Sequence, residues 1–258
     1  MTRVPAPHRH RIEIVGLRSL PEIQPGDDLA QLVFGALQDN GATLQRGDVV
    51  VLTQKIVSKA EGQLVRLSGV TPSALARQWA RHMRADPRLV EVVLRESRRV
   101  VRMNERVLIT ETHHGFVCAN AGVDASNLPE RGVVSCLPRD PDASARRIAR
   151  RLRQLLRIPV AVVVSDTWGR AWRLGLTNVA IGAAGLRVLE DLRGRRDACG
   201  RRLHATILAV ADDLAAAAGL VMGKGEKIPV AIIRGYRYRP ARETARQLLR
   251  PPQEDLFR

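Results

Sequence analysis

The segment Val160-Ala-Val-Val-Val-Ser-Asp-Thr-Trp-Gly-Arg170 joins the most strand-like run of the chain to a cluster of reactive side chains. Its first five residues are apolar and mostly β-branched, which is typical of a buried strand. Pro159 precedes them, at a position where a strand need lose no ladder hydrogen bond. We therefore predict a buried strand over Val160–Ser165.

Polar residues follow this strand at its carboxyl end, where ligands often bind in α/β proteins. Asp166 could bind a metal ion, the Thr167 hydroxyl could add a second oxygen, and Arg170 or Arg173 could bind a phosphate. The simpler interpretation is that Asp166 or Thr167 caps a helix. So many polar residue types in succession favour a functional site.

The rest of the chain predicts a mixture of helices and strands without regular βαβ units. Further strands are expected at Arg11–Val15, Val49–Thr53, Val107–Thr110, Phe116–Asn120, His204–Val210 and Pro229–Arg234. Helices are expected at Leu29–Leu37, from Ser73 to Arg84, from Asp86 to Glu96, from Asp140 to Leu156, and from Asp212 to Val221. The pattern indicates a single α+β unit, in which a second domain would be an insertion and not a separate body on a linker.

Length and composition restrict the class of protein. The 258 residues are 45% hydrophobic, enough for a substantial core, and no apolar run approaches the ~20 residues that cross a bilayer. The first eleven residues lack the apolar segment of a secretory signal. Three scattered cysteines form no CxxC pair, which argues against a disulfide framework or a zinc site. We expect a cytoplasmic protein with no membrane association.

The net charge of +16 raises the question of nucleic-acid binding. Aromatic residues make up only 3% of the chain, too few for a base-stacking surface. The charge could instead attract small polyanions, or reflect an arginine-rich background. The arginine-rich helix after Asp140 carries Ile148, Leu152 and Leu155 at helical spacing, so we interpret it as an amphipathic surface helix. No nucleic-acid partner is expected.

Three other segments are candidates for ligand contacts. In Asn120–Asn127, Asp124 offers a hard oxygen ligand and Gly122 allows unusual backbone angles, although a plain turn explains the segment equally well. In Thr53–Gly62, two lysines could bind phosphates, although ordinary surface lysines are the better interpretation of this segment alone. Met222–Lys227 resembles a phosphate-binding loop, but its glycine spacing does not match Walker A.

Taken in order, these segments resemble the coenzyme F420:L-glutamate ligase family. The resemblance covers residues 12–236 and depends on SKAEG at Ser58–Gly62, NAGVDASN at Asn120–Asn127 and SDT-x-GR at Ser165–Arg170. It extends to LPEI at Leu20–Ile23, VLRES at Val93–Ser97 and the loop that begins at Met222-Gly223. Each motif alone is weak, but the set at this spacing is specific.

The resemblance implies a GTP-dependent ligase that activates the carboxylate of F420-0 as an acyl phosphate, which L-glutamate then attacks. It implies Mg²⁺ or Mn²⁺, with potassium, and it implies metal ligands and catalytic positions at Asp124 and Asp166, with Thr167 as a further ligand. GTP contacts carry over to Leu20, Pro21, Glu22, Ile23, Gln54, Lys55, Lys59, Asn127, Met222, Gly223, Lys224, Gly225 and Glu226.

The implied fold is α+β, a mixed-sheet subunit of two subdomains in an intertwined homodimer. We expect a ligase domain over residues 12–240 made of two interleaved subdomains, a flexible N-terminus over 1–11 and a polar C-terminal tail over 241–258. The partners implied are F420-0 or a variant of it, L-glutamate and GTP.

Two positions depart from the family pattern. Lys224 stands where relatives can offer an acid as a further metal ligand. Three explanations are open: Glu226 takes that role, the charge of Lys224 replaces a second cation, or the enzyme binds one metal ion fewer. Asn178 also stands where an acid is expected. A related nucleotide-dependent ligase acting on another acidic cofactor is the alternative function, and a basic nucleic-acid-binding protein is a more distant one.

Overall fold

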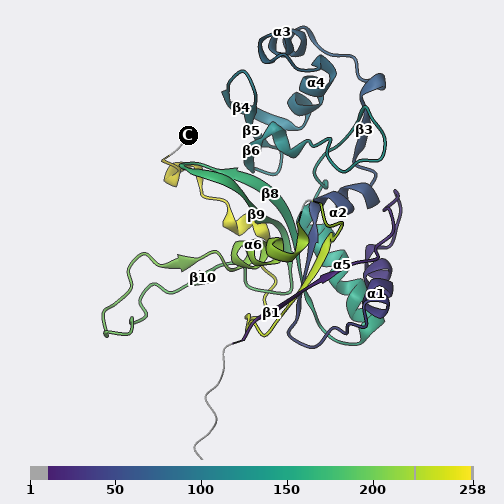
Figure 1. Cartoon of the computed structure of the whole chain (residues 1–258). Helices are drawn as coiled ribbons and strands as arrows, with labels where there is room; N and C mark the ends of the chain where they lie inside the picture. The colour runs from purple at the N-terminus through teal and green to yellow at the C-terminus, as the bar shows by residue number, and fades with distance from the viewer. Residues whose placement is uncertain (1–10, 224, 257–258) are drawn as a thin grey trace, which may run out of the picture.

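A mixed five-stranded sheet forms the centre of the molecule in a computed structural model that describes residues 11–223 and 225–256 (Figure 1). Its strand order is β1-β12-β2-β8-β9. The strands are β1 (Glu13–Leu17), β12 (Val230–Arg234), β2 (Val49–Thr53), β8 (Ala161–Arg170) and β9 (Arg173–Ala184). β2 and β8 run parallel and every other neighbouring pair is antiparallel. The fold is therefore α+β with a mixed sheet, as predicted.

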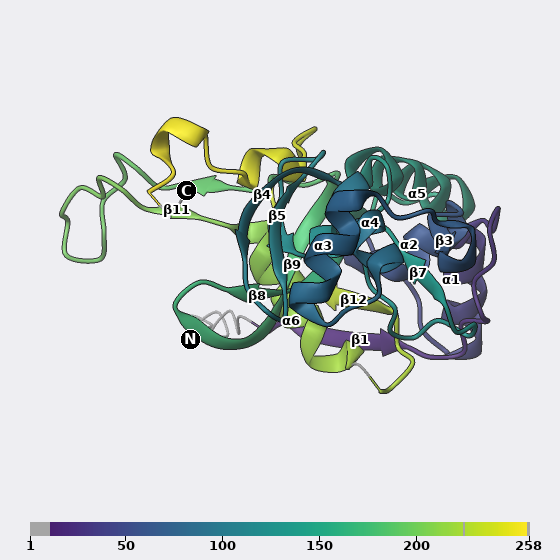
Figure 2. The ribbon, with the colours of Figure 1, turned by 90° about the horizontal axis from the view of Figure 1, so that it is seen from above.

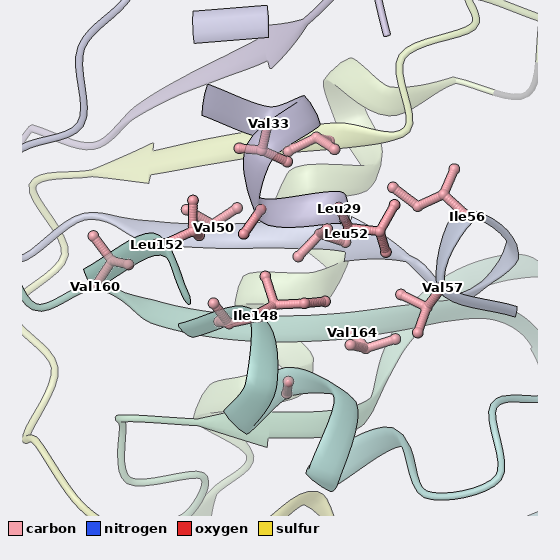
Figure 3. Packing of buried hydrophobic residues seen from close by; sticks show 14 of the residues in the cluster. Leu29, Val33, Val50, Leu52, Ile56, Val57, Ile148, Leu152, Val160 and Val164 are labelled. Carbon is pink, nitrogen blue, oxygen red and sulfur yellow. The ribbon is translucent and has the colours of Figure 1, made fainter. Parts of the chain in front are cut away.

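Helices cover both faces of this sheet. α1 (Leu29–Asp39) and α5 (Pro141–Leu156) pack on one face, and α6 (Val210–Met222) packs on the other (Figure 1). Since side chains alternate along a strand, Val162 and Val164 of β8 enter the first core, while Ala161 and Val163 enter the second. Figure 3 shows the first core, where Ile148 and Leu152 of α5 pack against Val50 and Leu52 of β2.

The start of α5 lies unusually close to β9. A Cβ atom at Gly182 would come within 2.3 Å of the Pro141 carbonyl oxygen, so no larger residue fits there without a shift. Beside it, the buried Asp142 carboxylate accepts hydrogen bonds from the backbone N–H groups of Ala183 and Ala245, both at 2.8 Å. This contact ties the C-terminal segment to the sheet.

Residues between β2 and α5 build a further layer with a hydrophobic core of its own, drawn at the top of Figure 1 and facing the viewer in Figure 2. It contains β3 (Leu64–Arg66), α3 (Ala74–Met83), α4 (Pro87–Arg95), β4 (Ser97–Met103), β5 (Leu108–Thr112), β6 (Val117–Ala119) and β7 (Val133–Ser135), with short 3-10 turns at Leu67–Gly69 and Asn120–Gly122. The sheet order here is β4-β5-β6, with β3 pairing β7. The division into two interleaved subdomains stays a prediction.

Most helix boundaries follow the sequence signals. Asp28, Ser73, Asp86 and Asp140 each accept a hydrogen bond from the first turn of the helix that follows, as N-cap residues do. The three cysteines are free, as expected. No helix among the described residues is long and apolar enough to cross a membrane.

Several elements differ from the sequence expectation. A short helix, α2 (Gln54–Ala60), follows β2 directly, and β8 continues five residues past Ser165 because β9 pairs with it along its whole length. The strand expected at His204–Val210 is reduced to β11 (Ile207–Leu208), which pairs with β10 (Glu190–Asp191) in a projecting hairpin (Figure 1). The C-terminal stretch forms 3-10 turns at Ala245–Leu248 and Pro252–Glu254. Residues 1–10 of the expected N-terminal segment lie outside the described residues.

Candidate active site

Four segments singled out in the sequence meet at one end of the central sheet, where β2 and β8 reach their carboxyl ends. We call this end of the strands an edge of the sheet. β2 and β8 are parallel, and Thr53 pairs with Ser165. The start of α2, which follows Thr53, therefore lies beside Asp166, which follows Ser165. β12 is antiparallel to β2 and starts at this edge, where the Thr53 N–H donates to the Pro229 carbonyl at 2.9 Å. β1 ends there, with Leu17 opposite Val230, and leads into Leu20–Ile23. Sheet topology thus assembles residues that are over 200 positions apart.

Lys55 lies at the centre of this edge. Its ammonium group contacts the Asp124 carboxylate, and it donates to the Ser126 carbonyl at 2.6 Å and the Ser126 hydroxyl at 3.2 Å. The Lys55 side chain is 14% exposed and that of Asp124 is 44% exposed. The carboxylate is therefore open to solvent while the cation beneath it is held.

Lys59 forms a second cation–carboxylate pair one helical turn further on, since residues four apart share a helix face. Its ammonium donates to Glu22 Oε1 at 2.5 Å and to the Asn127 carbonyl at 3.1 Å. Lys59 is only 7% exposed, so the interpretation of this segment as ordinary surface lysines is wrong. The Gln54 side chain is buried and accepts a hydrogen bond from the Ser58 hydroxyl at 2.8 Å.

The loop that carries Asp124 combines turn geometry with an outward carboxylate. Asn120, Ala121 and Gly122 all have positive φ, and a Cβ at Gly122 would lie 2.7 Å from Leu137. Asp124 then pairs its backbone with Ser135, while its Oδ1 accepts from the Ser126 N–H at 2.8 Å. The turn interpretation and the functional one are therefore compatible in this segment.

Asp166 is held rigidly on β8. Its Oδ1 accepts from the Thr167 N–H and its Oδ2 from the Trp168 indole N–H, both at 2.8 Å. Burial raises the pKa of this carboxyl group, and the nearby charge of Asp124 raises it further, against the two hydrogen bonds and Lys55, which lower it. Because β8 continues as a strand, the helix-cap interpretation is wrong.

Thr167 leaves β8 on the opposite face. The alternation that sends Val164 into the first core and Val163 into the second also separates Asp166 from Thr167. The Thr167 hydroxyl donates to Asn178 Oδ1 at 2.9 Å, and Asn178 lies against Gly219 of α6. The structure thus gives Asn178 a partner, and it does not direct the Thr167 hydroxyl toward the Asp166 carboxylate.

The remaining predicted contacts divide between core and surface. Ile23 and Met222 are 4% and 3% exposed, and their side chains belong to the first and second cores. Gly225, Glu226 and Pro21 are exposed, and Leu20 is partly buried. Glu226 Oε2 lies 3.9 Å from the Arg18 guanidinium, a loose surface contact. Lys224 lies outside the described residues.

The carboxylate oxygens of the candidate site suit a divalent cation whose remaining ligands are water or phosphate oxygens. Asp124 and Asp166 offer hard carboxylate oxygens, and the charge of Asp124 contributes to the raised pKa of Asp166. Among the described residues, no group of three or more His, Cys, Asp or Glu side chains could hold a metal ion. Two carboxylates plus water and phosphate oxygens is the arrangement that suits Mg²⁺.

Sequence reasoning gave no role to Ser126 or Trp168, each of which contacts one of the two acids. Trp168 also packs edge-on against Phe116, with ring centroids 5.4 Å apart. The signal for Trp168 was its position two residues after Asp166 in an extended strand, which places both side chains on one face. That signal required knowing that the strand continues.

Comparison with known proteins gives a consistent result. A family model described as F420-0:Gamma-glutamyl ligase matches residues 17–235. The coenzyme F420:L-glutamate ligase of Methanothermobacter thermautotrophicus is 45% identical over 250 residues, covering 96% of this chain and 99% of the relative. The protein of the same name from Methanopyrus kandleri is 47% identical, covering 96% and 97%. That from Methanocaldococcus jannaschii is 37% identical, covering 97% and 98%.

Proposed function

The chain belongs to the F420-0:gamma-glutamyl ligase family, and from this premise we propose that it is an enzyme that adds L-glutamate to coenzyme F420-0 in a GTP-dependent reaction. The observation that carries the proposal is the set of paired lysines and acids at the carboxyl ends of β2 and β8. This set combines cations for a triphosphate with carboxylates for a metal ion.

The chemistry requires activation of a carboxylate, which is a poor electrophile and repels a triphosphate. In the proposed reaction a carboxylate oxygen of F420-0 attacks the γ-phosphorus of GTP, and the bond to the β-phosphate oxygen breaks to release GDP. The glutamate amino group then attacks the acyl carbon, inorganic phosphate leaves, and the amine loses a proton. Such transfers depend on positioning and charge stabilisation more than on covalent help from the enzyme.

Lys55 and Lys59 are proposed to bind the phosphate groups. Both ammonium groups lie at the edge and are preoriented by backbone carbonyls, Lys55 by Ser126 and Lys59 by Asn127. Their carboxylate partners, Asp124 and Glu22, are about half exposed, so phosphate oxygens can approach the lysines without unfolding the site. Oriented cations lower the barrier by stabilising charge that develops in the transition state.

Asp124 and Asp166 are proposed to hold Mg²⁺ or Mn²⁺. A bound divalent ion would neutralise phosphate charge and align the transfer. Trp168 and the Thr167 N–H keep the Asp166 carboxylate in one orientation, and Ser126 does the same for Asp124. Thr167, on the other face of β8, would serve only a separate ion there, near Asn178.

The nucleotide, GTP, is proposed to lie between the Leu20–Ile23 segment and the loop from Met222 to Glu226.

A homodimer is also proposed. The tip of the β8–β9 hairpin exposes Trp172, Leu174 and Leu176, which are 86%, 99% and 59% accessible. Apolar residues gathered on a projecting hairpin are typical of a protein–protein interface.

Mass spectrometry of purified protein with F420-0, L-glutamate, GTP and Mg²⁺ or Mn²⁺ tests the function. The expected product is heavier than F420-0 by one or more glutamyl residues, and omission of any component should abolish it. Replacing GTP by ATP tests the nucleotide. A folded protein that gives no mass gain with F420-0, yet extends another acidic cofactor, would replace this proposal with the related ligase.

A further inference from the structure

A cavity lies at the other end of the central strands, where β2 and β8 begin, opposite the proposed active site. We call it the far-edge cavity. Its volume is about 1310 Å³, and its walls come from the segment before β2, the second half of α5, the start of β8 and the end of β12. A five-residue strand separates the two edges by roughly 15 Å. No residue of the proposed active site lines this cavity.

The walls of this far-edge cavity are strongly basic. Six arginines line it, namely Arg11, Arg46, Arg150, Arg153, Arg234 and Arg237, against two acids, Asp48 and Glu190. Both acids are already engaged, since Asp48 pairs with Arg234 at 2.7 Å and Glu190 lies 3.6 Å from Arg195. Within residues 11–223 and 225–256, none of the other five arginines has an ion pair with a carboxylate.

The neighbouring cavity on the other side of α5 provides an internal contrast. Its volume is about 980 Å³, and it too is lined by arginines of that helix. Here, however, Arg147 pairs with Glu61 at 2.6 Å and Arg151 with Asp28 at 2.9 Å. Within the described part of the chain, Arg150 lines both cavities without an ion pair, so the contrast on α5 is between the paired Arg147 and Arg151 on one side and the unpaired Arg153 on the other. The excess charge at the far edge is not a uniform property of α5.

We propose that the far-edge cavity binds a small oligophosphate anion, separately from any nucleotide at the active edge. Guanidinium groups match phosphate oxygens in a bidentate geometry and remain charged at all physiological pH values. Tyr236 and Tyr238 also line the cavity and add aromatic surface and hydroxyl groups. An anion would offset the excess positive charge of the cavity lining.

The size of the basic area argues for a small ligand and against a nucleic-acid backbone. A duplex needs a continuous basic stripe, whereas Glu61 and Asp28 offset the charges of Arg147 and Arg151 on α5 and interrupt such a stripe. The cavity is also concave, which suits a compact anion with several charges.

Isothermal titration calorimetry with inorganic tripolyphosphate tests the inference. The titration is made in a Lys55→Ala background, which weakens binding at the proposed nucleotide site. The double variant Arg46→Glu/Arg153→Glu should lower the remaining affinity by about tenfold or more, because it removes two charge-assisted contacts. The matched control, Arg77→Glu/Arg81→Glu, changes the same charge on the exposed face of α3 and should leave the affinity unchanged.

Equal affinities in the two double variants would overturn the inference, as would the absence of any tripolyphosphate binding in the Lys55→Ala background. A milder pair, Arg46→Gln/Arg153→Gln, replaces the reversed charges if the first variant does not fold. Competition by duplex DNA with a steep salt dependence would assign the cavity to nucleic acid instead. These results are independent of ligase activity, so the inference and the proposed function can fail separately.

Discussion

The two ends of the parallel β2–β8 pair both carry cation–carboxylate pairs, but the pairs differ in exposure. At the amino end, the Asp48 side chain is 2% exposed, and Arg234 donates to it at 3.1 and 2.7 Å. At the carboxyl end, the carboxylates of Asp124 and Glu22 are 44% and 53% exposed. The difference lies in the acids, buried at the closed end and exposed at the open end, since the cations follow the opposite order, with Arg234 30% exposed, Lys55 14% and Lys59 8%.

This difference distinguishes a pair that stabilises the fold from two pairs that are proposed to bind a ligand. Breaking a buried pair leaves an uncompensated charge without water, which costs about 3–5 kcal/mol. An exposed carboxylate can be hydrated when its pair is broken, so Asp124 and Glu22 can give up their lysines to a ligand at a lower cost. Burial of the acid separates the structural pair from the two pairs at the proposed active site.

The largest expected effect is on catalysis at the open edge. Asp166→Asn keeps an acceptor for Trp168 but removes the charge, so kcat/KM for glutamate addition should fall by about 10²–10³-fold with little change in Tm. Initial rates and thermal melts measure the two quantities. Asp213→Asn, on the exposed side of α6, is the control. Full activity of Asp166→Asn would remove this residue from the site.

The next effect is on stability at the closed edge. Arg234→Met should lower the free energy of unfolding by about 3 kcal/mol, because Asp48 would remain buried without its partner. Urea denaturation measures the change. Arg237→Met, at an exposed neighbour, should cost far less. If both variants unfold at the same urea concentration, the contrast between closed and open pairs does not hold.

A smaller effect is expected at Lys55. Lys55→Ala should raise the KM for GTP by about 10- to 100-fold through loss of a charged hydrogen bond, while stability changes by less than about 1 kcal/mol. Steady-state kinetics at varied GTP concentration tests this. Arg66→Ala, which breaks the exposed Arg66–Glu130 pair, should leave KM unchanged. A large loss of stability in Lys55→Ala would show that this pair is structural too.

The smallest effect concerns the pH dependence of stability at Glu91, a residue of intermediate exposure. The pKa of Glu91 is lowered from 4.5, first by the Ser73 backbone N–H, which donates to it at 2.8 Å, then by the Ser73 hydroxyl and by Arg95. A lowered folded-state pKa adds stability that is present above pH 4.5 and is lost as pH falls through the folded value.

Glu91→Gln should therefore be less stable than the native chain at neutral pH, and the difference should vanish in acid. Denaturation curves between about pH 7 and pH 3 test this. A constant difference across that range would show that the Glu91 charge makes no contribution.

Local sequence signals were sufficient for much of the fold. Capping residues such as Asp28 and Asp86 act through their own neighbouring N–H groups, so helix starts could be predicted without tertiary information. β2 was predicted from Val49 to Thr53, as it stands, because an apolar run between polar residues needs burial wherever it lies. β9 was missed because its first four residues are exposed and become a strand only by pairing with β8.

What the sequence determined by itself was membership of the family, since its motifs at this spacing match the family over residues 17–235. Only the tertiary structure decided how the segments that carry these motifs meet. The parallel pairing of β2 and β8 brings Lys55 near Asp124 and Asp166, and burial shows that Lys59 is not a surface lysine. Strand alternation separates Thr167 from Asp166, although they are adjacent in sequence. The physical reason is that bonding order fixes neighbours along the chain, whereas strand register and burial decide which side chains share a face and a dielectric environment.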